Sequence, residues 1–146
     1  MDLRERHHRP GRRVAPAGPC SSRGGSAVGS ELVQRYAAAL GARDWDAFAA
    51  LLDDDVVYRL PQTGEVVRGR EAFLRYNREF PGAWELTVLD AYGDERGGVL
   101  HGDYGVGESQ IGVTVLRFAG DRVAEVVDYW PEPYEPPAGR EHLTGR

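Results

Sequence analysis

The residues from Thr114 to Pro131 constrain the fold more than any other part of the chain, because they combine two apolar runs with a tight turn. The runs Thr114–Phe118 and Val123–Trp130 are joined at Gly120-Asp121. Gly and Asp tolerate the positive φ that tight hairpin turns require. The pattern therefore predicts a two-stranded antiparallel hairpin.

Alternation along the second predicted strand places a carboxylate on an apolar face. Side chains of a strand alternate between the two faces of a sheet, so Asp128 shares its face with Ala124, Val126 and Trp130. A carboxylate in such surroundings is costly unless it is paired or used. Asp128 is thus the main functional candidate, and the alternative is a structural carboxylate that accepts hydrogen bonds from the backbone or from Tyr36.

Helical spacing of apolar residues predicts three helices. The first is capped by Ser30 and stopped by Gly41, the second is capped by Asp44, and the third covers Gly69–Phe80. The acidic run Asp53–Asp55 is predicted to form a solvated turn after the second helix, because three consecutive side chains point in different directions and cannot hold one ion.

Six strand-like runs are separated by breaks or by short connections rich in Gly or Asp. They are Val56–Leu60, Glu65–Arg68, Trp84–Tyr92, Gly98–Tyr104, Glu108–Phe118 and Arg122–Trp130. Short links join the last four, and such links imply an antiparallel meander. Together with the helices, the order predicts an α+β domain whose curved sheet encloses a hollow, a common place for a ligand pocket.

The two ends of the chain differ from the domain between them. Residues 1–29 are rich in Arg, Gly, Pro and Ser, so they are predicted to be disordered. Residues 30–131 hold the domain, and residues 132–146 form a Pro-rich extension. A formal charge of −5 gives no support for a nucleic-acid partner. Without a membrane-span run or a signal peptide, we expect a cytoplasmic protein with no membrane partner.

The element order and three local matches resemble a known superfamily. The matches are Arg35–Pro61, Arg68–Tyr76 and Gly120–Trp130, and the superfamily is the cone-shaped α+β group of ketosteroid isomerase, SnoaL-like polyketide cyclases, limonene epoxide hydrolase and nuclear transport factor 2. The resemblance implies a curved antiparallel or mixed sheet around three helices and a small apolar ligand of polyketide, terpenoid or steroid type. It is less specific for activity, because this superfamily hosts many unrelated functions.

Ketosteroid isomerase matches the chain at one catalytic position and differs at two. Its hydrogen-bond donor on the first helix resembles Tyr36, but its general base corresponds to Leu60 and its second donor to Thr114. Since Leu cannot accept a proton, the resemblance gives no support to steroid isomerisation by that route.

Limonene epoxide hydrolase matches more positions. Its Arg-x-Asp pair resembles His101-Gly102-Asp103, its final-strand motif resembles Asp128–Trp130, and its water-positioning Tyr resembles Tyr58. Alternation puts the His and the Asp of the tripeptide on one face. The comparison therefore predicts a pair of carboxylates bridged by a cationic group, with a solvated strand face as the alternative.

The candidate site combines these positions with polar and aromatic residues of the predicted hollow. The predicted catalytic residues are Asp128, Tyr36, Asp103 and His101, and the predicted ligand-binding residues are Tyr58, Leu60, Asn77, Trp84, Gln110, Thr114 and Trp130. No metal or nucleotide motif is present, so we expect no cofactor. Two functions stay open. One is acid/base chemistry on a small, mainly apolar molecule (cyclisation, isomerisation, dehydration or epoxide hydrolysis), and the other is a non-catalytic ligand-binding or dimerisation module.

The other face of the last strands is more apolar than a water-facing sheet surface. It is predicted to carry Val113, Val115, Val123, Val127 and Tyr129. We therefore expect a homodimer formed through this face, which the superfamily resemblance also implies.

Overall fold

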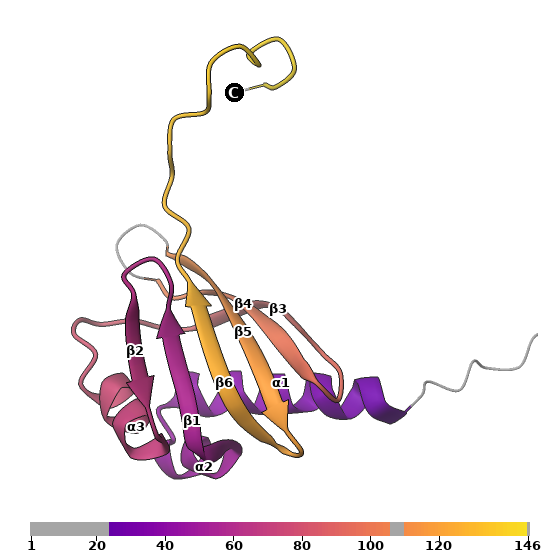
Figure 1. The fold of residues 1–146 in the computed structure, drawn as a ribbon, viewed down its shortest axis with the longest axis vertical. Helices are drawn as coiled ribbons and strands as arrows, with labels where there is room; N and C mark the ends of the chain where they lie inside the picture. The colour runs from indigo at the N-terminus through magenta and orange to yellow at the C-terminus, as the bar shows by residue number, and fades with distance from the viewer. Residues whose placement is uncertain (1–23, 106–109, 146) are drawn as a thin grey trace, which may run out of the picture.

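A six-stranded mixed sheet, curled but not closed, wraps around three helices in this computed structural model, which describes residues 24–105 and 110–145 (Figure 1). The elements are α1 (Gly24–Ala42), α2 (Trp45–Leu51), β1 (Leu52–Leu60), β2 (Glu65–Arg68), α3 (Arg70–Arg78), β3 (Thr87–Gly93), β4 (Gly97–Asp103), β5 (Ile111–Ala119) and β6 (Arg122–Tyr129). The strand order is β2-β1-β6-β5-β4-β3, with β1 parallel to β6 and the other neighbours antiparallel. The predicted α+β architecture is confirmed.

The predicted hairpin is formed by β5 and β6. Gly120 occupies its turn with a φ of 63°, and the register sets Thr114 directly opposite Asp128. A bulge next to Phe118 shifts the pairing at the turn end of the hairpin. As a result Val123 is fully buried in the core, so its predicted place on the outer face is wrong.

Aromatic side chains join the helices to the inner face of the sheet. Phe48 on α2 is fully buried, and its ring lies 4.9 Å from that of Tyr36 on α1 and 5.8 Å from that of Phe73 on α3. The Phe73 ring in turn stacks on Tyr58 of β1 at 4.8 Å. These contacts fix the helices relative to the strand that carries Tyr58.

The first helix begins earlier and ends later than the sequence indicated. Residues 24–29, predicted to be disordered, belong to α1, whereas residues 1–23 lie outside the described part. Gly41 is helical, and the left-handed residue after the helix is Arg43, with a φ of 54°. The Arg43 guanidinium donates to the Trp84 carbonyl at 2.6 Å and lies 4.3 Å from the Trp84 ring centre. These tertiary contacts explain why a residue other than Gly ends the helix.

Two glycines of α1 have opposite surroundings, which gives a matched prediction. A Cβ at Gly29 would collide with the carbonyl oxygen of Asp94, whereas one at Gly41 would lie 3.7 Å from the Leu86 Cβ, an ordinary contact. We expect Gly29→Ala to lower the free energy of unfolding by about 1–3 kcal/mol. Gly41→Ala is expected to raise it by about 0.4–1 kcal/mol. Urea denaturation measures both, and equal effects would contradict the close packing of α1.

Strand β1 starts just before the acidic run that was predicted to be a turn. Leu52 pairs with Val123 before a register shift that precedes Val57, so Asp53–Asp55 are strand residues. The Asp54 carboxylate lies 2.6 Å from the Arg70 guanidinium, which stabilises a charge that the turn prediction left to solvent.

The segment that follows β6 has no helix or strand in residues 131–145, and Figure 1 shows it leading away from the sheet. Within the described residues, no helix has the length and apolar character needed to cross a bilayer.

Candidate functional site

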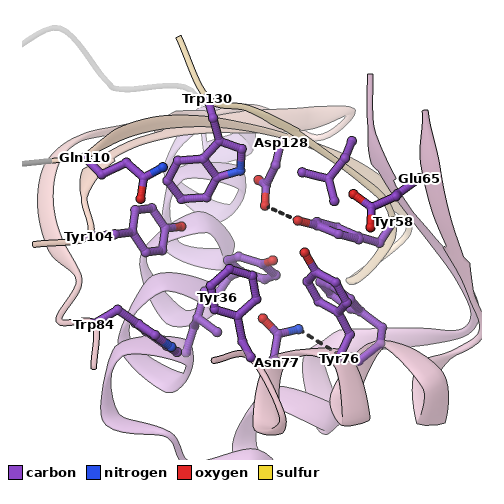
Figure 2. Close-up of a pocket in the computed structure, with 14 residues that line it drawn as sticks. Tyr36, Tyr58, Glu65, Tyr76, Asn77, Trp84, Tyr104, Gln110, Asp128 and Trp130 are labelled. Carbon is purple, nitrogen blue, oxygen red and sulfur yellow. Dashed lines mark hydrogen bonds between the residues drawn. The ribbon is translucent and has the colours of Figure 1, made fainter. Parts of the chain in front are cut away.

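A cavity of about 250 Å³ lies between the helices and the inner face of the sheet (Figure 2). Its lining comes from α1, α3, three strands (β1, β2 and β6) and the segments that flank the helices and strands: Tyr36, Leu40, Tyr58, Leu60, Glu65, Phe73, Tyr76, Asn77, Phe80, Trp84, Tyr104, Gln110, Asp128 and Trp130. Figure 2 shows Tyr36, Tyr58 and Tyr76 with their hydroxyl groups turned toward the middle of this space.

The Asp128 carboxylate is held by one hydroxyl group on each oxygen. Tyr58 donates to Oδ2 at 2.9 Å, and Thr114 donates to Oδ1 at 2.5 Å. The sheet register makes both contacts possible, because β6 lies between β1 and β5 and Thr114 pairs with Asp128. Asp128 is only partly exposed and lines the cavity, so its remaining acceptor positions can face a bound molecule.

Two further tyrosines line the cavity wall beside this cluster. The Tyr76 ring centre lies 4.9 Å from that of Tyr58, and the Tyr104 ring centre lies 4.7 Å from that of Trp130. Both phenols line the cavity. Tyrosine side chains therefore surround the space that the Asp128 carboxylate faces.

Burial sets the ionisation of this cluster. Desolvation raises the pKa of Asp128 above its ordinary value of 3.8, and the hydrogen bonds from Thr114 and Tyr58 offset part of that shift. Burial, with the neighbouring Asp128 as the next cause, also raises the pKa of Tyr36, Tyr58 and Tyr104. The phenols thus remain hydrogen-bond donors at neutral pH, while Asp128 is able to gain and lose a proton.

The raised pKa of Asp128 predicts a pH dependence of stability. In the unfolded chain the group titrates near 3.8, so the folded state binds more protons between that value and the raised pKa. The stability that Asp128 contributes is therefore complete below pH 3.8 and is lost as the pH rises through the folded pKa. Urea denaturation from pH 4 to 8 is expected to show a smaller loss in Asp128→Asn than in the unchanged protein. Parallel curves would contradict this.

Most of the predicted site residues lie at the cavity. Tyr36, Tyr58, Leu60, Asn77, Trp84, Gln110, Asp128 and Trp130 line it. Thr114 is buried behind the carboxylate and contacts the site through Asp128.

Hydrogen bonds and packing hold two of these residues in place, Asn77 and Trp130. The Asn77 amide donates to the Phe73 carbonyl at 2.8 Å. The backbone of Trp130 exchanges two hydrogen bonds with the Gln62 side chain, at 2.7 and 3.2 Å. The indole of Trp130 lies over Gly112, where a Cβ would come 2.9 Å from the ring.

The predicted site role of His101 and Asp103 is wrong. Both lie on the outer face, because the side chain of Leu100, which alternates with theirs along β4, is fully buried in the core. His101 Nδ1 lies 3.1 Å from the Asp90 carboxylate on β3, and Asp103 accepts from the Gly105 backbone at 2.9 Å. Neither can bridge to Asp128, so the carboxylate pair suggested by the limonene epoxide hydrolase comparison is not formed.

Three polar residues of the cavity were missed as site residues: Glu65, Tyr76 and Tyr104. The alternation of β4 offered a signal for Tyr104, since it shares a face with the apolar Leu100. Helical spacing offered a signal for Tyr76, since it follows Phe73 by three residues on α3. Glu65 follows the turn after β1, and nothing in the sequence marks it as a site residue, since its short strand is mostly exposed.

Comparisons with known proteins agree with this architecture. The family model of the SnoaL-like domain matches residues 33–126. A Kribbella flavida protein provisionally assigned as a ketosteroid isomerase is 42% identical, with a TM-score of 0.79, covering 83% of this chain and 90% of that one. A comparison with curated proteins finds no significant match.

More distant structures share the fold. A nuclear transport factor 2-like protein from Burkholderia xenovorans is 23% identical, with a TM-score of 0.69, covering 82% of this chain and 95% of that one. A SnoaL-like polyketide cyclase, provisionally assigned, from Shewanella denitrificans is 19% identical, with a TM-score of 0.62, covering 71% and 90%. On the family match, the 42% identity and the shared cone-shaped architecture, the chain belongs to the SnoaL-like domain family.

Proposed function

We propose that this domain binds a small, mainly apolar molecule in the cavity and moves a proton of that molecule with Asp128, without a cofactor. The observation that carries the proposal is the Asp128 carboxylate, which faces the cavity while neutral hydroxyl groups of Tyr58 and Thr114 hold its two oxygens. A carboxylate with a raised pKa beside hydrogen-bond donors suits general acid/base catalysis near neutral pH.

In the proposed mechanism Asp128 accepts a proton from the bound molecule and returns it at another position. Tyr58 and Thr114 stabilise the anion and hold its plane, so that one lone pair of each oxygen stays available to the ligand. Tyr36 faces the cavity and acts as donor to an oxygen of the substrate. Since no cation bridges Asp128 to a second carboxylate in the described residues, the arrangement favours isomerisation, cyclisation or dehydration over epoxide hydrolysis.

The volume of the cavity limits the ligand. An apolar cavity of about 150 Å³ accommodates benzene, and drug-sized ligands occupy about 300 Å³ or more. At about 250 Å³ the cavity fits a molecule of one or two rings. A polyketide- or steroid-sized ligand would extend beyond the cavity.

The experiment uses 5-nitrobenzisoxazole, a compact two-ring probe of carboxylate bases. A base removes its C–H proton, the N–O bond breaks, and the coloured phenolate that forms is measured by absorbance. We expect saturable turnover above the rate in buffer, inhibited by small apolar molecules that compete for the cavity. A rate that matches free acetate at equal concentration would contradict the proposal.

A non-catalytic ligand-binding module is the second candidate. It is favoured by the two hydrogen bonds that Asp128 already accepts, because a structural carboxylate would be satisfied in the same way. The two candidates separate in one measurement: a binding module retains ligand affinity but gives no turnover of the probe.

We also propose a homodimer formed through the outer face of the sheet. Val113 and Val115 of β5 and Val127 and Tyr129 of β6 make an apolar stripe there, and Tyr129 is 43% exposed. Light scattering at micromolar concentration is expected to give twice the monomer mass. Tyr129→Glu should shift that mass toward the monomer, and a monomeric unchanged protein would contradict the proposal.

A further inference from the structure

The cavity wall is built mainly of aromatic rings. Eight of the lining side chains are aromatic: Tyr36, Tyr58, Phe73, Tyr76, Phe80, Trp84, Tyr104 and Trp130. They come from both helical and strand elements, so ring faces and edges surround the space on several sides (Figure 2). Pockets with this composition suit apolar ligands, and they also suit organic cations, because the face of an aromatic ring carries negative charge.

The charged side chains of the lining have one sign. Asp128 lies at the inner end and Glu65 at the exposed rim, and the described lining contains no Arg and no His. The guanidinium of Arg43 stacks on Trp84 without lining the cavity. That face of Trp84 is already occupied, so the other rings supply most of the attraction for a cation.

Asp128 also lacks a cationic partner within the described residues, since its hydrogen bonds come from the hydroxyl groups of Tyr58 and Thr114. Most buried carboxylates are paired with a positive charge, because desolvation is otherwise costly. The cavity is thus complementary to a ligand that brings one positive charge.

We propose that the ligand of this cavity is a small organic amine, bound as its ammonium ion against the aromatic rings with its charge facing Asp128. The inference rests on the proposed function, because it names the ligand class of the same pocket. Glu65 at the rim adds attraction as the cation enters. The positive charge of the bound ammonium lowers the pKa of Asp128, so the carboxylate is ionised in the complex and can still accept a proton. The alkyl groups of the ammonium supply the mainly apolar surface.

The test is a pair of probes with the same shape and different charge. Choline carries a trimethylammonium group, and 3,3-dimethylbutan-1-ol has a carbon atom in place of the nitrogen. Titration calorimetry on the full chain is expected to show choline binding about ten-fold or more tightly than the alcohol, since cation–π contacts and a buried counter-charge favour only the cation.

Variants of the two cavity acids test whether these acids cause the preference for choline. Asp128→Asn is expected to remove most of the difference between the two probes, and Glu65→Gln, at the exposed rim, to reduce it about two- to five-fold. Glu71→Gln is the matched control, because Glu71 is an exposed acid on α3 that does not line the cavity. It should leave both affinities unchanged.

The outcomes separate this inference from the proposed function. Equal or tighter binding of the alcohol overturns the amine class and leaves the apolar pocket in place. Absence of binding by both probes also overturns it, while turnover of 5-nitrobenzisoxazole still decides the acid/base function. A preference for choline that survives in both Asp128→Asn and Glu65→Gln would overturn the role of the cavity acids.

Discussion

The Asp128→Asn variant is expected to lose about 10²-fold or more of the turnover of 5-nitrobenzisoxazole while it keeps its fold. Asn has nearly the same size as Asp, and its carbonyl can still accept from one hydroxyl group, while its amide can donate to the other. The change therefore removes the titrating group and little else. Because Asn keeps the size and the hydrogen-bonding capacity of Asp, the loss reports proton transfer rather than packing.

Controls keep this result specific. Tyr129→Phe alters the neighbouring residue on the outer face, so it should leave the rate unchanged. Circular dichroism and thermal melting of Asp128→Asn should match or exceed those of the unchanged protein. Thr114→Val removes one donor to Asp128 and is expected to shift the pH–rate profile to higher pH, since a hydrogen bond that favours the charged form is lost. A folded Asp128→Asn protein with undiminished turnover would remove Asp128 from the mechanism.

The hairpin and its carboxylate were predictable because they follow from local rules. A Gly-Asp turn between apolar runs predicts the hairpin, and alternation puts Asp128 on an apolar face without any knowledge of the rest of the chain. The pairing of Thr114 with Asp128 depends in addition on the bulge beside Phe118. Tyr58 is different, because β1 and β6 are far apart in the sequence. The resemblance to limonene epoxide hydrolase suggested Tyr58 as a water-positioning residue, and the parallel pairing of the two strands accounts for its contact with Asp128.

The wrong predictions concern which face of the sheet a strand residue occupies, because a shift of one residue moves a side chain to the opposite face. The bulge beside Phe118 turns Val123 inward, and the pairing energetics that place a bulge depend on the partner strand. His101 and Asp103 were assigned to the pocket by analogy of motif, although the large apolar Leu100 between Val99 and His101 favours the opposite orientation. Burial of a Leu outweighs the placement of a polar motif.

The largest effect on stability is expected from Phe73→Ala, which should lower the free energy of unfolding by about 3–5 kcal/mol. Phe73 is 1% exposed, and its ring contacts those of Phe48 at 5.8 Å and Tyr58 at 4.8 Å. Removing it opens a void between the helices and β1 that the rigid strand cannot close. Urea denaturation followed by circular dichroism measures the loss.

Phe80→Ala is the matched control, because Phe80 also lines the cavity but is 43% exposed. The free energy lost on truncation increases with the buried area of the side chain. Phe80→Ala should therefore lower the free energy of unfolding by about 1 kcal/mol or less. Phe73→Leu retains most of the volume and should fall between the two. The Phe73 ring also supports the Tyr58 ring through stacking, so a folded Phe73→Ala protein should bind apolar probes in a larger cavity yet turn over 5-nitrobenzisoxazole more slowly. Equal destabilisation by Phe73→Ala and Phe80→Ala would show that Phe73 does not join the core to the site.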